Sequence, residues 1–600
     1  MKEFLKNIKK AWKYGKNQKK YIIGYIAFNV VFIFINLFVP ILSAKIIVSL
    51  TSNQFEQVLF IGLVILIVEI LRNTAYYATS YFRHRIFRET FNEIEISLGT
   101  EILKIENSCL DENGSGLFIQ RLTNDASKVA DIFVVLNVYL TNIVTNIGIF
   151  LAVFIISKIM FLYIVIMITT IFIVEKKRIT IVNQKDKAYR KEHEKLSGFV
   201  GELVHGAHDI KMLNAEKSFI KELGKRITRL NQEKYNMNSI NRNYQFITGT
   251  LRDLFDAGSI FTSILLIAQG NLTIANALVV HNYMGNLASI VFYISEFLEK
   301  VKDFNLSSER IFSIMDSEEF PKEKFGKKQL KKIHGDFEFK NVYFGYNKEQ
   351  LTIKNMSFKI KANSTVAFVG KSGAGKSTVF SLLCKMYDIN SGDITIDGIS
   401  IKELDKDSIR GNITIISQNP YIFNMSIKEN LRLVKENLTD EEMIEACKTA
   451  CLDEFVNSLP EGYDTMIGEG GINLSGGERQ RLAIARALVQ KTEIILFDEA
   501  TSALDNETQS SIKQAIDNMK NEYTILIIAH RLSTVINSDK ILLVEDGTIV
   551  DEGTHEELLK NSKTYHQLYD AELKNKMIKK SNKIPNFQEK NKFHKIVEKN

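Results

Sequence analysis

Long apolar stretches fill the first half of the chain, and short ones follow in the second half. Six of the long stretches reach or approach the roughly 20 residues that a helix needs to cross the hydrocarbon core of a bilayer. They contain too few charges to give each helix a face in contact with water, so the core helices of a soluble protein do not account for them. The predicted spans cover residues 21–50, 58–81, 130–156, 160–174, 246–268 and 274–297.

The connections between these spans differ in their content of lysine and arginine. Residues 51–57 and 269–273 contain neither, and residues 157–159 contain only Lys158, whereas the N-terminal segment and the two long connections contain many. Lysine and arginine accumulate on the cytoplasmic side of a membrane. We therefore expect both termini and both long connections to lie in the cytoplasm.

The two long connections, 82–125 and 176–242, have a charged, helix-forming composition. This composition predicts that membrane helices continue into the cytoplasm and turn back at short elbows, near residues 111–116 and 208–216. The first half of the chain is therefore predicted to be an all-α transmembrane domain of six helices that extend into the cytoplasm.

The pattern changes near residue 320, where Pro321 and a lysine-rich polar run predict a linker. From residue 335 to about 572, short apolar strands alternate with helices, which is typical of an α/β nucleotide-binding domain with a largely parallel sheet. The tail contains many lysines, and we expect it to be poorly ordered. The predicted segments are an N-terminal segment 1–20, a transmembrane domain 21–316, a linker 317–334, a nucleotide-binding domain 335–573 and a tail 574–600.

The formal net charge is +7, and most of the excess lies at the two ends of the chain. Lysine runs of this kind are more often solvated tails or membrane-surface contacts than nucleic-acid sites. We therefore expect membrane lipid as a partner and no nucleic acid. The four cysteines show no metal-ligand spacing and indicate a reduced, cytosol-facing protein: Cys109, Cys384, Cys447 and Cys451.

The sequence TVAFVGKSGAGKST, residues 365–378, places a glycine-rich loop between an apolar strand and a helical segment. It fits the pattern G-x-x-x-x-G-K-[ST] of a phosphate-binding loop. In such a loop backbone N–H groups face an anion, Lys376 reaches the outer phosphates and the Ser377 hydroxyl ligates Mg²⁺. The alternative is a glycine turn before an ordinary helix. The candidate phosphate-binding residues are Gly370, Lys371, Ser372, Gly373, Ala374, Gly375, Lys376, Ser377 and Thr378.

A second candidate lies in EIILFDE, residues 493–499, where a short apolar run ends in two carboxylates. A run that is apolar on both faces predicts a central parallel strand, and such sheets bind ligands at the carboxyl ends of their strands. Asp498 is therefore expected beside Ser377, holding Mg²⁺ through water. Glu499 is the candidate general base for the water that attacks the γ-phosphate. Paired acids at a strand end also occur as helix caps, so these two residues alone leave both interpretations open.

The stretch NLSGGERQRLAIARA, residues 473–487, opens a strongly helical, arginine-bearing segment. Ser475, Gly476 and Gly477 would form a helix N-terminus whose N–H groups can hold an anion. The same domain already has its phosphate loop. A second anion site therefore suggests that the nucleotide is shared with another copy of the domain.

These motifs, in this order, resemble the ATP-binding cassette (ABC) transporter family over nearly the whole chain. The resemblance implies an α/β P-loop NTPase domain of ABC type that binds ATP and Mg²⁺. LSGGE, residues 474–478, is similar to the family signature, with Glu478 where many members have glutamine. TMIGEGG, residues 465–471, is similar to the segment that contacts the intracellular helices in exporters.

Four single residues take their roles from this resemblance. Tyr346 is similar to the aromatic residue that stacks on adenine. Gln418, after the strand ITIIS, resembles the glutamine that contacts Mg²⁺ and senses the membrane domain. His530, after YTILIIA, resembles the switch histidine that touches the γ-phosphate, and Asp505 ends a D-loop-like SALD. Each residue alone is a weak signal, because a lone histidine after a strand is more often structural.

The membrane half resembles the type I exporters, in which six helices precede one cassette on the same chain. Residues 121–129 and 307–316, RLTNDASKV and SSERIFSIMD, are similar to stretches that recur in that subgroup. The resemblance implies a half-transporter that works as a dimer. A second copy of the chain would suffice because every motif is intact, and a related half-transporter remains a possible partner.

Ionisable residues inside the predicted spans are candidates for a polar patch in a translocation cavity. Glu69 and Arg72 are one helical turn apart, and so are Arg252 and Asp256, next to Asp253. This spacing lets each pair neutralise itself, so structural pairing is the alternative.

The sequence predicts a primary active transporter that couples ATP hydrolysis to the export of a drug-like, lipid or peptide substrate by alternating access. The fold does not select among these cargoes. An ATP-gated channel or a regulatory membrane ATPase is the alternative, although such proteins often have degraded catalytic motifs. Six membrane spans exclude a soluble cassette ATPase acting on DNA or ribosomes.

Overall fold

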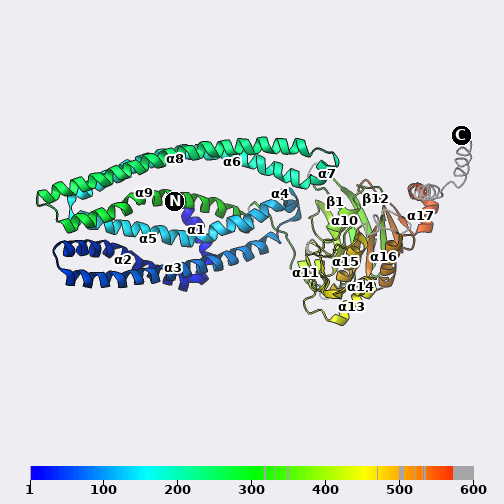
Figure 1. The fold of residues 1–600 in the computed structure, drawn as a ribbon. Helices are drawn as coiled ribbons and strands as arrows, with labels where there is room; N and C mark the ends of the chain where they lie inside the picture. Colours follow the sequence, from blue (N-terminus) through cyan, green and yellow to red (C-terminus); the bar gives the residue numbers. More distant parts are fainter. Residues whose placement is uncertain are drawn as a thin grey trace, which may run out of the picture. The chain divides into compact units, whose positions relative to one another are not determined.

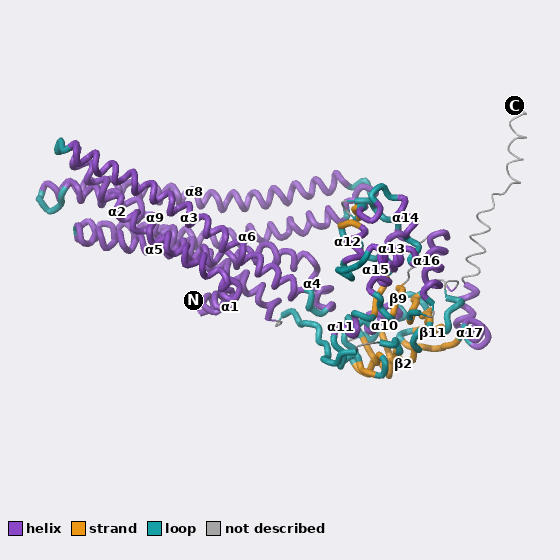
Figure 2. The backbone as a smooth tube through the Cα atoms, turned by 90° about the horizontal axis from the view of Figure 1, so that it is seen from below, coloured by secondary structure: helices purple, strands orange, loops and turns teal. Residues whose placement is uncertain are grey.

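The computed structural model describes residues 2–316, 319–330, 333–347, 350–468, 471–498, 506–520, 522–529, 532 and 535–571. The chain divides into two compact units: Met1–Leu103 with Gly114–Phe320, and Lys104–Asn113 with Pro321–Asn600. We call them the membrane unit and the ATPase-fold unit. Within the described residues the membrane unit is helical, and all named strands belong to the ATPase-fold unit (Figure 2).

The membrane unit is built from long helices joined by short turns (Figure 1). Helices α2 and α3 lie side by side, and α6 lies along α8. Glycine at position 24 lets α2 and α3 approach closely, because a Cβ there would lie 2.9 Å from the end of the Phe82 ring and the ring would have to shift. The helices of this unit are α1 (Lys2–Gly15), α2 (Lys19–Thr51), α3 (Phe55–Ile102), the second half of α4 (Asn107–Gln120), α5 (Ala126–Ile156), α6 (Lys158–His205), α7 (Ala207–Met212), α8 (Glu216–Ala268) and α9 (Ile274–Asp316).

Five helical segments of the described chain are long and apolar enough to cross a membrane. They contain five of the six predicted spans: Lys2–Thr51, Phe55–Ile102, Asn107–Ile156, Lys158–His205 and Ile274–Asp316. The remaining predicted span, 246–268, lies in α8. It does not qualify by composition, because Arg252, Asp253 and Asp256 lie within its apolar part. Its pairing with α6 is what places it in the bundle.

Both long connections turn back at short elbows. The second elbow is α7, between α6 and α8. At the first, α3 ends and the backbone breaks at Gly114, whose φ of 67° favours glycine. Residues 104–113 pack with the ATPase-fold unit: Glu106 N donates to Pro321 O at 2.9 Å and Glu323 N donates to Lys104 O at 2.8 Å. Sequence analysis had assigned this segment to the membrane domain.

The two exporter-like stretches of the membrane half meet in the structure. Residues Arg121–Asp125 form a single π-helical turn before α5, which packs against the end of α9. Ser307 Oγ donates to the buried Asp125 Oδ1 at 2.7 Å. Arg121 Nη1 donates to Arg310 O at 2.8 Å. A buried carboxylate requires such partners, so this network fixes how the start of α5 packs against the end of α9.

The ionisable residues of the spans pair in two ways. Glu69 and Arg72 form the predicted ion pair. The predicted pairing of Arg252 with Asp256 is wrong: Arg252 Nε lies 3.8 Å from Asp253 Oδ1, and Asp256 Oδ1 lies 3.4 Å from His281 Nδ1. The reason is that α8 packs against α9, which brings a histidine of the neighbouring helix to Asp256.

The ATPase-fold unit contains a six-stranded sheet of order β12-β11-β3-β10-β9-β6, in which only β12 is antiparallel to its neighbour. A four-stranded antiparallel sheet has the order β2-β1-β4-β5, and β7 pairs with β8. The strands are β1 (Phe337–Phe344), β2 (Ile353–Ile360), β3 (Thr365–Val369), β4 (Ser391–Ile396), β5 (Ile399–Ser400), β6 (Ile413–Ile416), β7 (Met425–Ser426), β8 (Met466–Ile467), β9 (Ile494–Asp498), β10 (Thr524–Ile528), β11 (Lys540–Glu545) and β12 (Thr548–Gly553).

The central strands are buried on both faces, as their continuous apolar runs predicted. Alternate residues of β9 enter two different cores: Ile495 and Phe497 pack in one, and Ile494 and Leu496 pack in the other. The helices of this unit are α10 (Lys376–Leu383), α11 (Lys406–Arg410), α12 (Ile427–Arg432), α13 (Asp440–Thr449), α14 (Asp453–Ser458), α15 (Gly476–Gln490), α16 (Asn506–Met519) and α17 (His555–Asn561).

Candidate functional site

The glycine-rich loop connects β3 to α10 at the carboxyl edge of the parallel sheet. Gly373 and Gly375 have φ values of 81° and 98°, which L side chains rarely adopt. A Cβ at Gly370 would lie 2.1 Å from the carbonyl oxygen of Val544 in β11, so only glycine fits there. Gly375 provides no side-chain cap for α10. The first N–H groups of that helix are therefore suited to bind an anion.

Lys376 lies inside the curl of the loop and is only 4% exposed. Its Nζ donates to Gly370 O at 2.9 Å and to Lys371 O at 2.8 Å. These contacts hold the ammonium group of Lys376 against the loop, where a phosphate that binds to the loop would contact it. Among the other loop residues, Lys371, Ser372, Gly373 and Ser377 are exposed, whereas Ala374, Gly375 and Thr378 are buried.

Ser377 and Asp498 are brought together from different elements. Strand β9 lies between β10 and β6, and all three are parallel. Its carboxyl end therefore lies at the same edge as the phosphate-binding loop, and Ser377 Oγ donates to Asp498 Oδ1 at 3.0 Å. A hydroxyl and a carboxylate are hard oxygen ligands of the kind that Mg²⁺ prefers, with water completing its shell. This donor set fits Mg²⁺.

Gln418 follows β6 at this same edge, because Ile416 of β6 pairs with Phe497 of β9. Its side chain is exposed. Gln480, a buried residue of α15, donates from Nε2 to the backbone oxygen of Gln418 at 3.3 Å. The signature helix and the segment around Gln418 are therefore in direct contact.

Tyr346 follows β1, and half of its surface is exposed. Its hydroxyl lies 3.2 Å from Thr378 Oγ1 at the start of α10. Two other rings pack against it nearly perpendicularly, Phe344 at a centroid distance of 5.0 Å and Tyr387 at 5.1 Å. An exposed aromatic ring next to the phosphate-binding loop is suited to stack on a base.

Ser475 caps α15 in a reciprocal arrangement with Glu478. The Ser475 side chain accepts from Glu478 N at 3.3 Å, and Glu478 Oε2 accepts from Ser475 N at 2.7 Å. This capping box fixes the start of the helix. Ser475 remains exposed, whereas Gly477 is buried under it and Gly476 is half-buried.

Three predicted site residues, Glu499, Asp505 and His530, lie outside the described residues, and so do Glu469 and Gly470 of the TMIGEGG segment. In the sequence, Glu499 directly follows Asp498, the last residue of β9, and His530 follows the buried Ala529 after β10.

Arg486 of α15 was missed by sequence analysis. Its Nη1 donates to Tyr421 O at 2.9 Å and its Nε donates to Asn430 O at 3.2 Å, so it anchors the segment that follows Gln418. Burial lowers the pKa of the Arg486 guanidinium to about 10, so it stays charged at neutral pH. The signal available in the sequence was an arginine inside the apolar run LAIARALV.

Residues 22–290 match the description "ABC transporter transmembrane region", and residues 353–502 match "ABC transporter". An "ATP-dependent lipid A-core flippase" of Haemophilus influenzae is 40% identical over 309 residues, 51% of this chain and 52% of that protein. The protein of the same description from Shigella sonnei is 31% identical over 514 residues, 84% of this chain and 87% of that protein. The match to the Haemophilus protein thus spans about half of it.

The fold is similar to that of a solved structure described as a bacterial Atm1-family ABC exporter with ATP bound. The TM-score is 0.79, with 23% identity over 92% of this chain and 98% of that one. Together these matches cover both the helical region and the nucleotide-binding domain. The chain therefore belongs to the ABC transporter family and combines an ABC transporter transmembrane region with one ATP-binding domain of that family.

Proposed function

We propose that the chain is one half of a dimeric ATP-driven exporter in the cytoplasmic membrane. The observation that carries the proposal is the contact between Ser377 and Asp498 beside a complete phosphate-binding loop, on the same chain as a bundle of membrane-spanning helices. Lysine and arginine content supports a cytoplasmic position for both termini and for the ATPase domain. ATP would drive the transporter by binding the closed state more tightly than the open one.

Mg²⁺ would be held by Ser377, Asp498 and Gln418, directly or through water. When bound, the metal neutralises charge on the β- and γ-phosphates. Lys376 and the loop N–H groups bind and orient the triphosphate. Glu499 would orient and deprotonate the attacking water, and His530 would contact the γ-phosphate and stabilise the charge that develops there.

A second chain would complete each ATP site. Ser475, Gly476 and Gly477 of one chain would meet the ATP that is held by residues 370–378 of the other, with Asp505 near the contact. The support is that the domain has two helix starts suited to anions but one complete phosphate-binding loop. The carboxylate of Glu478 is held back in its capping box, which leaves the Ser475 hydroxyl at the exposed surface. Two copies of this chain suffice, and a related half-transporter is the alternative partner.

The proposed cargo is a lipid-like amphiphile, because two similar proteins are described as lipid A-core flippases. Drug-like molecules and peptides are the competing classes. The test is ATP hydrolysis by the purified chain in proteoliposomes, with lipids, cationic drugs and peptides added in turn. Stimulation of ATP hydrolysis by lipids, absent from the Lys376→Ala variant, supports the proposal. Stimulation by drugs or peptides and not by lipids would show that the cargo belongs to one of those classes instead.

Ser377→Ala is expected to raise the Mg²⁺ concentration needed for half-maximal ATP hydrolysis about tenfold or more, because it removes one of the oxygen ligands. The matched control is Ser381→Ala, one turn further along α10, where the hydroxyl donates only to the backbone oxygen of Ser377 at 3.2 Å. The measurement is an ATPase titration with Mg²⁺ at fixed ATP. An unchanged Mg²⁺ requirement in Ser377→Ala would remove this hydroxyl from the metal site.

A further inference from the structure

Tyr387 contacts both the proposed adenine platform and the first elbow. Its ring packs on Tyr346 at a centroid distance of 5.1 Å and an interplanar angle of 86°. Its hydroxyl donates to Asp111 Oδ2 at 2.8 Å. One aromatic side chain therefore bridges the nucleotide site and residues 104–113, which lie far away in the sequence.

Within the part of the chain that the structure describes, three side chains contact Tyr346 through its ring or hydroxyl. The residue is 52% exposed, and the three contacts are those with the Thr378 hydroxyl and with the rings of Phe344 and Tyr387. Phe344 is fully packed as the last residue of β1. Tyr387 is the less confined of the two ring partners, because it lies in the loop after α10 and is itself only half-buried.

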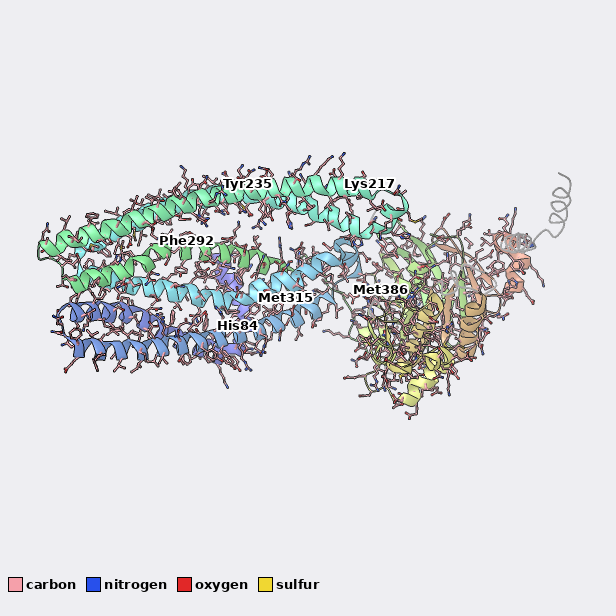
Figure 3. The ribbon with its side chains drawn as sticks, in the orientation of Figure 1. His84, Lys217, Tyr235, Phe292, Met315 and Met386 are labelled. Atoms are coloured by element: carbon pink, nitrogen blue, oxygen red, sulfur yellow. The ribbon has the colours of Figure 1, made fainter. Side chains whose placement is uncertain are left out.

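Residues 104–113, the part of the first elbow that packs with the ATPase-fold unit, hold the loop after α10 through polar contacts. Asn107 Nδ2 donates to the backbone oxygen of Met386 at 3.2 Å. Met386, which is labelled in Figure 3, directly precedes Tyr387 in the sequence. A cavity of about 330 Å³ lies between the elbow and the loop, lined by Asp111, Glu112, Tyr346 and Tyr387 among others. Burial and the hydrogen bond to Asp111 raise the pKa of the Tyr387 hydroxyl, so it remains a donor at neutral pH.

We propose that Tyr387 is a positioning residue for adenine binding and that Asp111 of the first elbow sets its orientation, so that docking of the elbow adjusts the affinity for ATP. The inference rests on the proposed function, because it takes Tyr346 as the adenine platform. Tyr387 acts through Tyr346 and contacts no nucleotide itself. Removing it lets the platform ring reorient, which costs stacking with the base but no contact with the phosphates.

The first test measures equilibrium binding of Mg²⁺ with AMP-PNP to the full-length protein in detergent. Tyr387→Ala is expected to raise the Kd about threefold to tenfold, the range of one aromatic pair. Binding of tripolyphosphate, which lacks the base, is expected to be unchanged, and so is kcat at saturating ATP. The double variant Tyr346→Ala/Tyr387→Ala is expected to bind AMP-PNP no more weakly than Tyr346→Ala alone.

The second test addresses the elbow. Asp111→Ala and Tyr387→Phe each break the same hydrogen bond, so each is expected to raise the Kd for AMP-PNP about twofold to threefold, with no further increase when combined. Asp111→Asn keeps an acceptor and is expected to restore affinity. Glu112→Ala, which removes an adjacent exposed carboxylate, is the matched control and should bind as the unmodified chain does.

Equal weakening of AMP-PNP and tripolyphosphate binding by Tyr387→Ala would overturn the proposal, because Tyr387 would then support the domain as a whole. Normal affinity in Tyr387→Ala together with weak binding in Tyr346→Ala would overturn the positioning role alone. Normal affinity in Tyr346→Ala would instead reject the adenine platform of the proposed function, and the role of Tyr387 with it.

Discussion

Glu499→Gln is expected to lower steady-state ATP hydrolysis on the order of 100-fold or more while leaving ATP binding intact. Glutamine keeps the shape of the side chain but cannot accept the proton of the attacking water. Binding should persist because the phosphates are held by other groups, the loop N–H groups and Lys376. The measurements are ATP turnover and equilibrium ATP binding on the same preparation.

The matched control for this variant is Glu493→Gln. Glu493 directly precedes β9, whereas Glu499 directly follows it in the sequence. Glu493→Gln therefore makes the same chemical change at the end of the strand that lies away from the phosphate-binding loop. Its turnover should equal that of the unmodified chain. Near-normal turnover in Glu499→Gln would remove Glu499 from the mechanism.

Lys376→Ala is expected to reduce ATP hydrolysis by on the order of 100-fold and to weaken ATP binding as well. The ammonium group is buried and donates to two loop carbonyls, Gly370 O and Lys371 O. Its loss therefore removes both a charge at the outer phosphates and two contacts that shape the loop. ATP binding and turnover measured together separate this variant from Glu499→Gln, in which binding persists.

Lys402→Ala controls for the loss of a lysine in the same unit. Lys402 Nζ also donates to a backbone carbonyl, Gly392 O at 3.3 Å, but it lies beside the four-stranded sheet. Its binding and turnover should be unchanged. If Lys376→Ala binds and hydrolyses ATP normally, the phosphates of ATP do not bind at this loop and the prediction is wrong.

The parts of the site that sequence analysis predicted are those with strong local patterns. Gly370 to Ser377 specify the loop by their own conformations, and the apolar run before Asp498 specifies a buried parallel strand. The carboxyl ends of parallel strands lie at one edge of a sheet, so the loop that follows β3 and the carboxylate that ends β9 are expected at the same edge. The contact of Ser377 with Asp498 could therefore be expected from two short segments that are 121 residues apart.

The contacts that sequence analysis missed depend on how separate elements pack. Tyr387 and Asp111 are 276 residues apart, and no pattern in either segment indicates that they meet. Spacing along one helix predicted the wrong partner for Asp256, because the histidine that pairs with it comes from α9. The apolar part of α8 carries three charges, so its place in the bundle also depends on its neighbours rather than on its own composition.

Enclosure of ATP between two chains is tested most directly by cross-linking. The background is a cysteine-free chain with Glu499→Gln, in which the buried Cys109, Cys384 and Cys447 become alanine and Cys451 becomes serine. Two differently tagged chains, one with Ser372→Cys and one with Ser475→Cys, are co-expressed, since both positions are exposed.

The account predicts a disulfide between the two tagged chains that forms with ATP and not with ADP, whereas mixtures of two Ser372→Cys or two Ser475→Cys chains give none. A cross-link only with a different half-transporter would replace the homodimer by a heterodimer. ATP-bound chains that never cross-link, or full ATPase activity from a demonstrably monomeric protein, would contradict a shared site.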